Sequence, residues 1–153
     1  MTRLCCDVLK RLAGKTLCTA ESCTGGGIGA ALTGVSGSSA VYKGGIISYT
    51  NQVKHDLLGV DYALLDTHGA VSAPVAEAMA IGARMALKAD IAVSVTGLAG
   101  PGGDDFGNPV GRVYIGYADE KRIIHREFTF SGHREEVRSQ AVEAVFKLIL
   151  ELN

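Results

Sequence analysis

Apolar residues along the chain follow two alternating patterns: short continuous runs, and longer runs with a helical period. Continuous apolar runs bounded by glycine or polar residues are typical of buried strands. The expected strands are 16–20, 45–49, 91–96, 112–118 and 122–130, the last two forming a hairpin around Asp119-Glu120. Apolar residues three and four positions apart predict helices at 3–13, 28–32, 51–58 and 72–88, and a final helix after Ser131.

Polar residues predict where three of these helices begin. Asn51, Ser72 and Ser131 each precede a segment of helical period, as N-cap residues do. Pro74 fits the first turn after Ser72, because proline is tolerated where no backbone N–H is needed.

The order of the segments predicts the fold class. Strands alternate with helices before the closing hairpin and helix, and neither a linker nor an internal repeat is visible. We therefore expect one domain over residues 1–153, an α/β protein built as a three-layer α/β/α sandwich with a mixed, mostly parallel sheet. Ligands in such folds bind beyond the carboxyl ends of strands, which here points to the loops after Ala20 and Thr96.

Charge and composition argue against several classes of function. The formal net charge is −1 and runs of Lys or Arg are absent, so electrostatics give no support to nucleic-acid binding. No apolar stretch approaches the ~20 residues of a membrane-spanning helix. Asp7, Lys10 and Arg11 interrupt the N-terminus where a signal peptide would be apolar. We expect a cytoplasmic protein with neither nucleic-acid nor membrane partners.

The residues that usually hold metals are not spaced as ligands. The four cysteines lie within the first 23 residues without a CxxC pair, which predicts free thiols. Asp104-Asp105 stands in a glycine-rich loop, where two acids predict a turn with solvated side chains and a metal site is the alternative. The Rossmann fingerprint fails because no acid occurs between Glu21 and Asp56, and neither GxSxG nor HExxH is present.

Glycine accounts for 20 of the 153 residues, well above its usual share of ~7%. One cluster follows the first strand, in Glu21-Ser22-Cys23-Thr24-Gly25-Gly26-Gly27. Such a strand-to-helix turn presents a hydroxyl beside unpaired N–H groups, which suit a phosphate or a developing oxyanion. The alternative is a simple helix start in which Ser22 or Thr24 is the cap.

Lys54 is a candidate base. With Asn51 as the N-cap, it would be the third residue of a helix, where the positive end of the helix dipole lowers a lysine pKa. Leu57 and Leu58 would crowd the same side, and desolvation lowers the pKa further. A lysine that titrates low can act as a general base; the alternative is an ordinary surface lysine.

The sequence resembles the CinA C-terminal domain family. No single motif is specific, but all of them appear in the family's order and cover nearly the whole chain. The motifs are TAESCTGG at 19–26, GSSAVY at 37–42, YTNQVK at 49–54, HGAVS at 68–72, VTGLAGPGG at 95–103, PVG at 109–111 and SGHR at 131–134.

The resemblance implies an oligomeric α/β/α enzyme that hydrolyses the carboxamide of nicotinamide mononucleotide without a metal or cofactor. By the same resemblance Ser22 is the nucleophile, Lys54 its base, Tyr49 an aid to proton transfer and Arg134 a phosphate ligand. We expect the partners to be the nucleotide substrate and further copies of the chain. Residues expected to bind substrate, including oxyanion donors, are Thr24, Gly25, Gly26, Asn51, Thr96, Gly97, Ala99 and Gly100.

The chain departs from the family pattern at three places. Asn108 stands where lysine is common, His133 where aspartate is common, and the loop at Asp104-Asp105 is more acidic than usual. Alternatives remain open for the roles as well. Cys23 is the rival nucleophile, Arg138 is the reserve phosphate ligand, and a non-catalytic nucleotide-binding module is the alternative function.

Overall fold

The computed structural model describes residues 1–153, and a five-stranded mixed sheet forms its centre. The strands lie in the order β2-β1-β3-β4-β5. β1 pairs in parallel with β2 and β3, while β4 is antiparallel to both β3 and β5. The predicted mixed sheet is confirmed, and β4 alone runs against the other strands. The bounds are β1 Leu17–Glu21, β2 Tyr42–Ile47, β3 Ile91–Gly97, β4 Arg112–Ala118 and β5 Ile123–Thr129.

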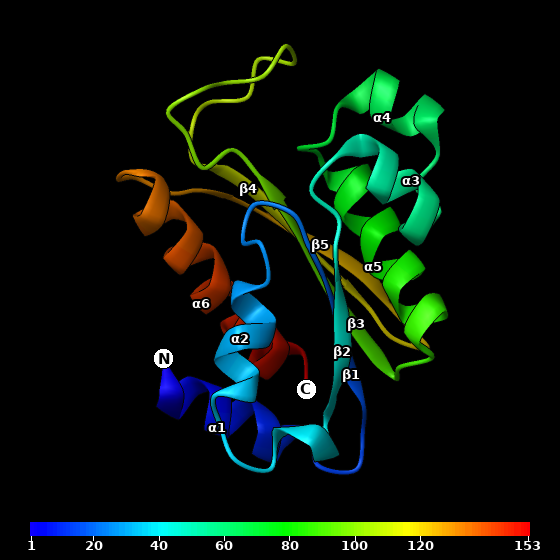
Figure 1. Ribbon diagram of the computed structural model, residues 1–153, viewed down its shortest axis with the longest axis vertical. Coiled ribbons are helices and arrows are strands. Elements are labelled where there is room, and N and C mark those ends of the chain that lie inside the picture. The colour runs from blue at the N-terminus through cyan, green and yellow to red at the C-terminus, as the bar shows by residue number, and fades with distance from the viewer.

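Helices cover both faces of the sheet, which confirms the three-layer α/β/α sandwich (Figure 1). One layer holds α1, α2 and α6, and the other holds α3, α4 and α5. Their bounds are α1 Thr2–Arg11, α2 Gly27–Thr33, α3 Asn51–Leu58, α4 Tyr62–His68, α5 Ala73–Leu87 and α6 Arg134–Leu152, with a short 3-10 helix at Ser38–Ala40. None of the helices has the length and apolar composition needed to cross a bilayer.

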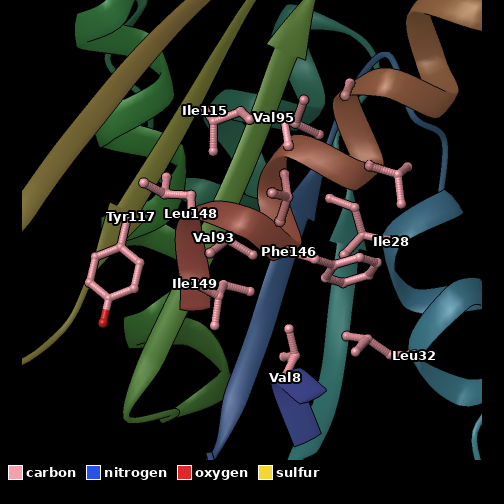
Figure 2. Packing of buried hydrophobic residues seen from close by; sticks show 14 of the residues in the cluster. Val8, Ile28, Leu32, Val93, Val95, Ile115, Tyr117, Phe146, Leu148 and Ile149 are labelled. Atoms are coloured by element: carbon pink, nitrogen blue, oxygen red, sulfur yellow. The ribbon is translucent and has the colours of Figure 1, made fainter. Parts of the chain in front are cut away.

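The larger core lies between the sheet and the layer of α1, α2 and α6. Figure 2 shows Phe146 and Ile149 of α6 facing Ile28 of α2 and Val93 of β3. All four side chains are fully buried. A second core of mainly small residues lies under α5, where alanines bring the helix close to the sheet. The two cores hold the strands in place. The loops expected to bind a ligand follow the carboxyl ends of β1 and β3.

Two of the predicted helix caps are wrong, and their neighbours take the role. Thr50, not Asn51, caps α3, because its hydroxyl accepts a hydrogen bond from the Val53 N–H (3.3 Å). His133, not Ser131, caps α6: its ring accepts from the Glu136 N–H, and the Glu136 carboxylate accepts from the His133 N–H. His133 thus performs the cap role for which aspartate is preferred.

Other boundaries differ modestly from the predictions. β2 occupies Tyr42–Ile47 rather than 45–49. The Ser48 N–H still donates to the Glu21 carbonyl, and the chain then turns into α3. α4 was not predicted; its N-cap is Asp61, which accepts from the Ala63 N–H. Ser72 does precede α5, with Pro74 in the first turn, but its hydroxyl donates to the Gly69 carbonyl rather than capping the helix.

Candidate functional site

A cleft of about 600 Å³ opens beyond the carboxyl ends of β1 and β3. It lies at the end of the sheet where the long β3–β4 loop projects and where α6 begins (Figure 1). Its size is ordinary for a small-molecule site, for which the usual range is ~300–1,000 Å³. The predicted residues that line it are Ser22, Tyr49, Asn51, Lys54, Thr96, Gly97, Ala99, Gly100 and Arg134.

Ser22 and Lys54 meet in this cleft although 32 positions separate them in the chain. Lys54 Nζ lies 3.1 Å from Ser22 Oγ. It also donates to the carbonyl oxygens of Ser48 (2.7 Å) and Tyr49 (3.2 Å). Lys54 is only 1% exposed, so the alternative of a surface lysine is wrong.

Burial lowers the pKa of Lys54 from 10.5 to about 8. Desolvation disfavours the ammonium form, and no carboxylate forms an ion pair with Lys54 to compensate. The cause differs in detail from the prediction, because Leu57 is 56% exposed and does not crowd the amine. Lys54 is also the fourth residue of α3 rather than the third.

The two carbonyl partners orient the amine. A neutral lysine amine has two N–H donors and one lone pair. With the donors directed to the Ser48 and Tyr49 carbonyls, the third direction faces Ser22 Oγ, 3.1 Å away. In this protonation state the lone pair can accept the Ser22 proton, which is the geometry a general base requires.

Glu21, which the sequence analysis did not single out, leaves the Ser22 hydroxyl free of a capping role. Its carboxylate accepts from the Ile28 N–H (2.9 Å), the Gly29 N–H (3.1 Å) and the Thr24 hydroxyl (2.7 Å). These contacts satisfy backbone N–H groups at the start of α2, so neither Ser22 nor Thr24 is the cap of this helix. The sequence signal for this role is an acid at the end of an apolar strand, directly before the candidate nucleophile.

Thr24, Gly25 and Gly26 lie in the same turn but do not line the cleft. The Arg138 guanidinium covers this side of the turn, donating from Nε to the Cys23 carbonyl (3.0 Å) and from Nη2 to the Thr24 carbonyl (3.2 Å). Arg138 likewise does not line the cleft, so it is not placed to bind a ligand there.

The β3–β4 loop supplies the opposite wall. The buried Thr96 hydroxyl donates to the Ala70 carbonyl (2.8 Å), which fixes the loop where it leaves the strand. The N–H groups of Ala99 and Gly100 have no acceptor within the protein, and both residues line the cleft. Free backbone donors in a cleft suit an oxyanion.

The departures from the family pattern in this loop form one hydrogen-bonded unit. Asp104 accepts from the N–H groups of Phe106 and Asn108 (both 3.1 Å) and from Asn108 Nδ2 (2.8 Å). Asn108 Nδ2 also donates to the Val71 carbonyl (3.0 Å). Partial burial raises the pKa of Asp104, but these hydrogen bonds outweigh it, and the pKa falls below its usual value. The predicted turn is therefore confirmed, but only Asp105 is exposed, because the Asp104 carboxylate is bound within the turn. The structure contains no group of three or more His, Cys, Asp or Glu side chains that could hold a metal ion.

Arg134 and Tyr49 stand together at the cleft. Arg134 Nη1 donates to the Gly100 carbonyl (2.9 Å), and Nη2 donates to Tyr49 Oη (3.2 Å). Arg134 forms no ion pair with Glu135 or Glu136, because Glu136 is engaged with His133. A guanidinium without a carboxylate partner is available to an anion entering the cleft.

Cys23 is poorly suited to compete with Ser22. Its side chain is 6% exposed, and burial raises the pKa of its thiol to about 11. A reactive cysteine needs a lowered pKa, because the thiolate is the nucleophile.

The fold and cleft define a class: a three-layer α/β/α protein with a buried serine–lysine pair beyond its parallel strands. A family model described as the CinA C-terminal domain matches residues 2–153, and the chain belongs to this family. It is 53% identical over 121 residues, 78% of its length, to a CinA-like protein of Thermosynechococcus vestitus. It is 48% identical over 144 residues, 94% of its length, to one from Mycolicibacterium gilvum. The chain spans about a third of these relatives, 29% and 34% of their lengths.

Solved structures agree with this membership. A competence/damage-inducible protein from Agrobacterium tumefaciens superposes with a TM-score of 0.95 at 40% identity, covering 99% of this chain and 94% of that one. A CinA superfamily protein from Escherichia coli gives a TM-score of 0.97 at 32% identity, covering 99% and 90%. The predicted family is therefore confirmed.

Proposed function

We propose that the protein hydrolyses the carboxamide of nicotinamide mononucleotide to nicotinate mononucleotide and ammonia, with Ser22 as nucleophile and Lys54 as base. One observation carries the proposal: Lys54 Nζ, buried and without a carboxylate partner, lies 3.1 Å from Ser22 Oγ in the cleft. The choice of substrate follows the resemblance to the CinA family, in which such an amidase activity is expected.

The reaction proceeds in two stages. Neutral Lys54 takes the Ser22 proton as Oγ attacks the carboxamide carbon, and the resulting ammonium returns that proton to the departing amine. Ammonia leaves and an acyl-serine remains. Water, activated by Lys54, then cleaves the ester and releases the carboxylate. In this second stage Lys54 passes the proton that it takes from water to Ser22 Oγ, which regenerates the serine. Each turnover consumes one water, and the released ammonia takes up the proton of the new carboxylic acid, so the products are one carboxylate and one ammonium ion and both atoms and charge balance.

The remaining cleft residues fit the rest of the substrate. The free N–H groups of Ala99 and Gly100 are donors for the oxyanion. The Arg134 guanidinium is the candidate phosphate ligand, since its planar fork can bind two phosphate oxygens at once. Tyr49 Oη, which accepts a hydrogen bond from Arg134, would assist proton transfer.

The test is direct incubation of the purified chain with nicotinamide mononucleotide. We expect ammonia and nicotinate mononucleotide to appear in equal amounts, and the Ser22→Ala protein to form neither. Tight binding of the mononucleotide without turnover would instead support a non-catalytic nucleotide-binding module. Release of nicotinamide rather than ammonia would show cleavage of the glycosidic bond and would contradict the proposal.

A further inference from the structure

Two aromatic side chains line the cleft, and they differ in how they are held. Tyr49 is 60% exposed, but its hydroxyl accepts a hydrogen bond from Arg134. Phe106 is 50% exposed and has no polar atom to anchor it. Both residues therefore leave a large area exposed at the cleft, and Phe106 is held there without a side-chain hydrogen bond.

The ring of Phe106 packs against the backbone of Gly69. A Cβ atom on Gly69 would lie 2.6–2.9 Å from three atoms of the ring, so only glycine lets the ring rest there. Gly69 also has a φ of +78°, which favours glycine independently. One side of Phe106 is thus seated on the backbone before α5, while half of the residue stays exposed at the cleft.

The backbone of Phe106 is fixed as well. Its N–H donates to Asp104 Oδ1 (3.1 Å), and Asn108 ties the same turn to the Val71 carbonyl (3.0 Å). Segment 104–108 is therefore an ordered turn that presents an aromatic ring at the cleft.

Charges of both signs line the cleft. Asp104 and Asp105, which directly precede Phe106, line it together with Arg134, which adjoins Tyr49. A ligand with a cationic planar ring and an anionic group would match these charges. A cation is attracted to the face of an aromatic ring, and the attraction strengthens when the pair is desolvated.

We propose that Phe106 is a specificity-determining platform on which the positively charged pyridinium ring of the substrate stacks, with the Asp104–Asn108 turn holding it in place. The proposal rests on the proposed function for the identity of the ring. It goes beyond that function in assigning recognition of the ring's positive charge to Phe106 and the turn that holds it.

The test measures binding to the Ser22→Ala protein, in which turnover is absent. Two probes are compared by calorimetry: nicotinamide mononucleotide, whose ring is cationic, and its reduced form, whose dihydropyridine ring is uncharged. Both carry the carboxamide and the phosphate. We expect the cationic form to bind about three- to tenfold more tightly, the scale of one partly desolvated cation–π contact.

Variants then assign that preference to Phe106. Phe106→Leu keeps an apolar residue on Gly69 and should remove the preference, whereas Phe106→Trp should keep it, because tryptophan is the strongest cation–π partner. Ile123→Ala on β5 removes a similarly exposed apolar side chain, 53% exposed, away from the cleft and should change neither affinity. An unchanged preference in Phe106→Leu would overturn the platform. Tight, Phe106-dependent binding by a wild-type chain that releases no ammonia would instead contradict only the proposed function.

Discussion

Arg134, the first residue of α6, donates a hydrogen bond to the hydroxyl of Tyr49, 85 positions earlier in the chain. The contact joins the start of the last helix to the turn that leads into α3. The same guanidinium holds the Gly100 carbonyl in the β3–β4 loop. One side chain therefore links three segments that line the cleft.

Ser22→Ala should abolish amide hydrolysis and leave the fold intact. The hydroxyl accepts a hydrogen bond from Lys54 but caps no helix, so its removal costs little structure. A nucleophile and base act as one unit, so losing either should lower kcat by several orders of magnitude. Ammonia release and the thermal unfolding midpoint are the measurements. An active Ser22→Ala protein alongside an inactive Cys23→Ala protein would make Cys23 the nucleophile.

Activity should rise with pH through about 8, because the pKa of Lys54 is lowered to about 8 and only the neutral amine is a base. Lys54→Arg should be nearly inactive at every pH up to 10, since arginine stays protonated. The pH profile of kcat/KM provides the measurement. An active Lys54→Arg protein, or a profile with no limb between pH 7 and 9, would remove lysine as the base.

Lys54 should also make stability depend on pH. Between pH 8 and 10.5 the unfolded chain holds a proton on Lys54 that the folded chain has lost, so the unfolding free energy rises with pH. The shift corresponds to about 3 kcal/mol at ~1.36 kcal/mol per pKa unit. Below pH 8 Lys54 is protonated in both states, so the folded state carries the full cost of burying its ammonium group.

Urea unfolding of Lys54→Met at pH 7 to 10.5 isolates this contribution. The substitution leaves the Ser48 and Tyr49 carbonyls without their donor at every pH, which gives a constant cost. The wild type should gain about 3 kcal/mol relative to Lys54→Met across the window. Parallel stability curves for the two proteins would mean that Lys54 titrates normally.

The layers could be predicted from the sequence because they depend on local pattern, whereas the pairing of Ser22 with Lys54 was implied by the resemblance to the CinA family. Buried strands and the helix of 134–152 are marked by their apolar period, and the turn of Ser22 is marked by its glycines. The helix caps could not be separated from their neighbours in the same way. Thr50 and Asn51 are both good caps, and the choice depends on where the chain leaves β2.

Contacts between elements that are far apart in the chain could not be predicted from the sequence. Glu21 reaches the start of α2, and Arg138 reaches the outer side of the Ser22 turn, only once two elements are packed together. Arg134 and Arg138 lie one helical turn apart, and the sequence left both open as phosphate ligands. They diverge in the structure because Arg134 is the first residue of α6 at the cleft, whereas Arg138 lies against the Cys23 carbonyl.

Arg134→Ala should weaken use of nicotinamide mononucleotide by ~1–3 kcal/mol in kcat/KM, the scale of a lost charged hydrogen bond. Nicotinamide riboside, which lacks the phosphate, should already be a poor substrate and should respond little. Arg138→Ala is the matched control, because this arginine binds backbone outside the cleft and should affect both substrates equally. The substrate comparison matters because Arg134 also holds the Gly100 carbonyl. A loss confined to the mononucleotide indicates contact with phosphate, whereas equal losses on both substrates would mean that Arg134 acts by holding the loop.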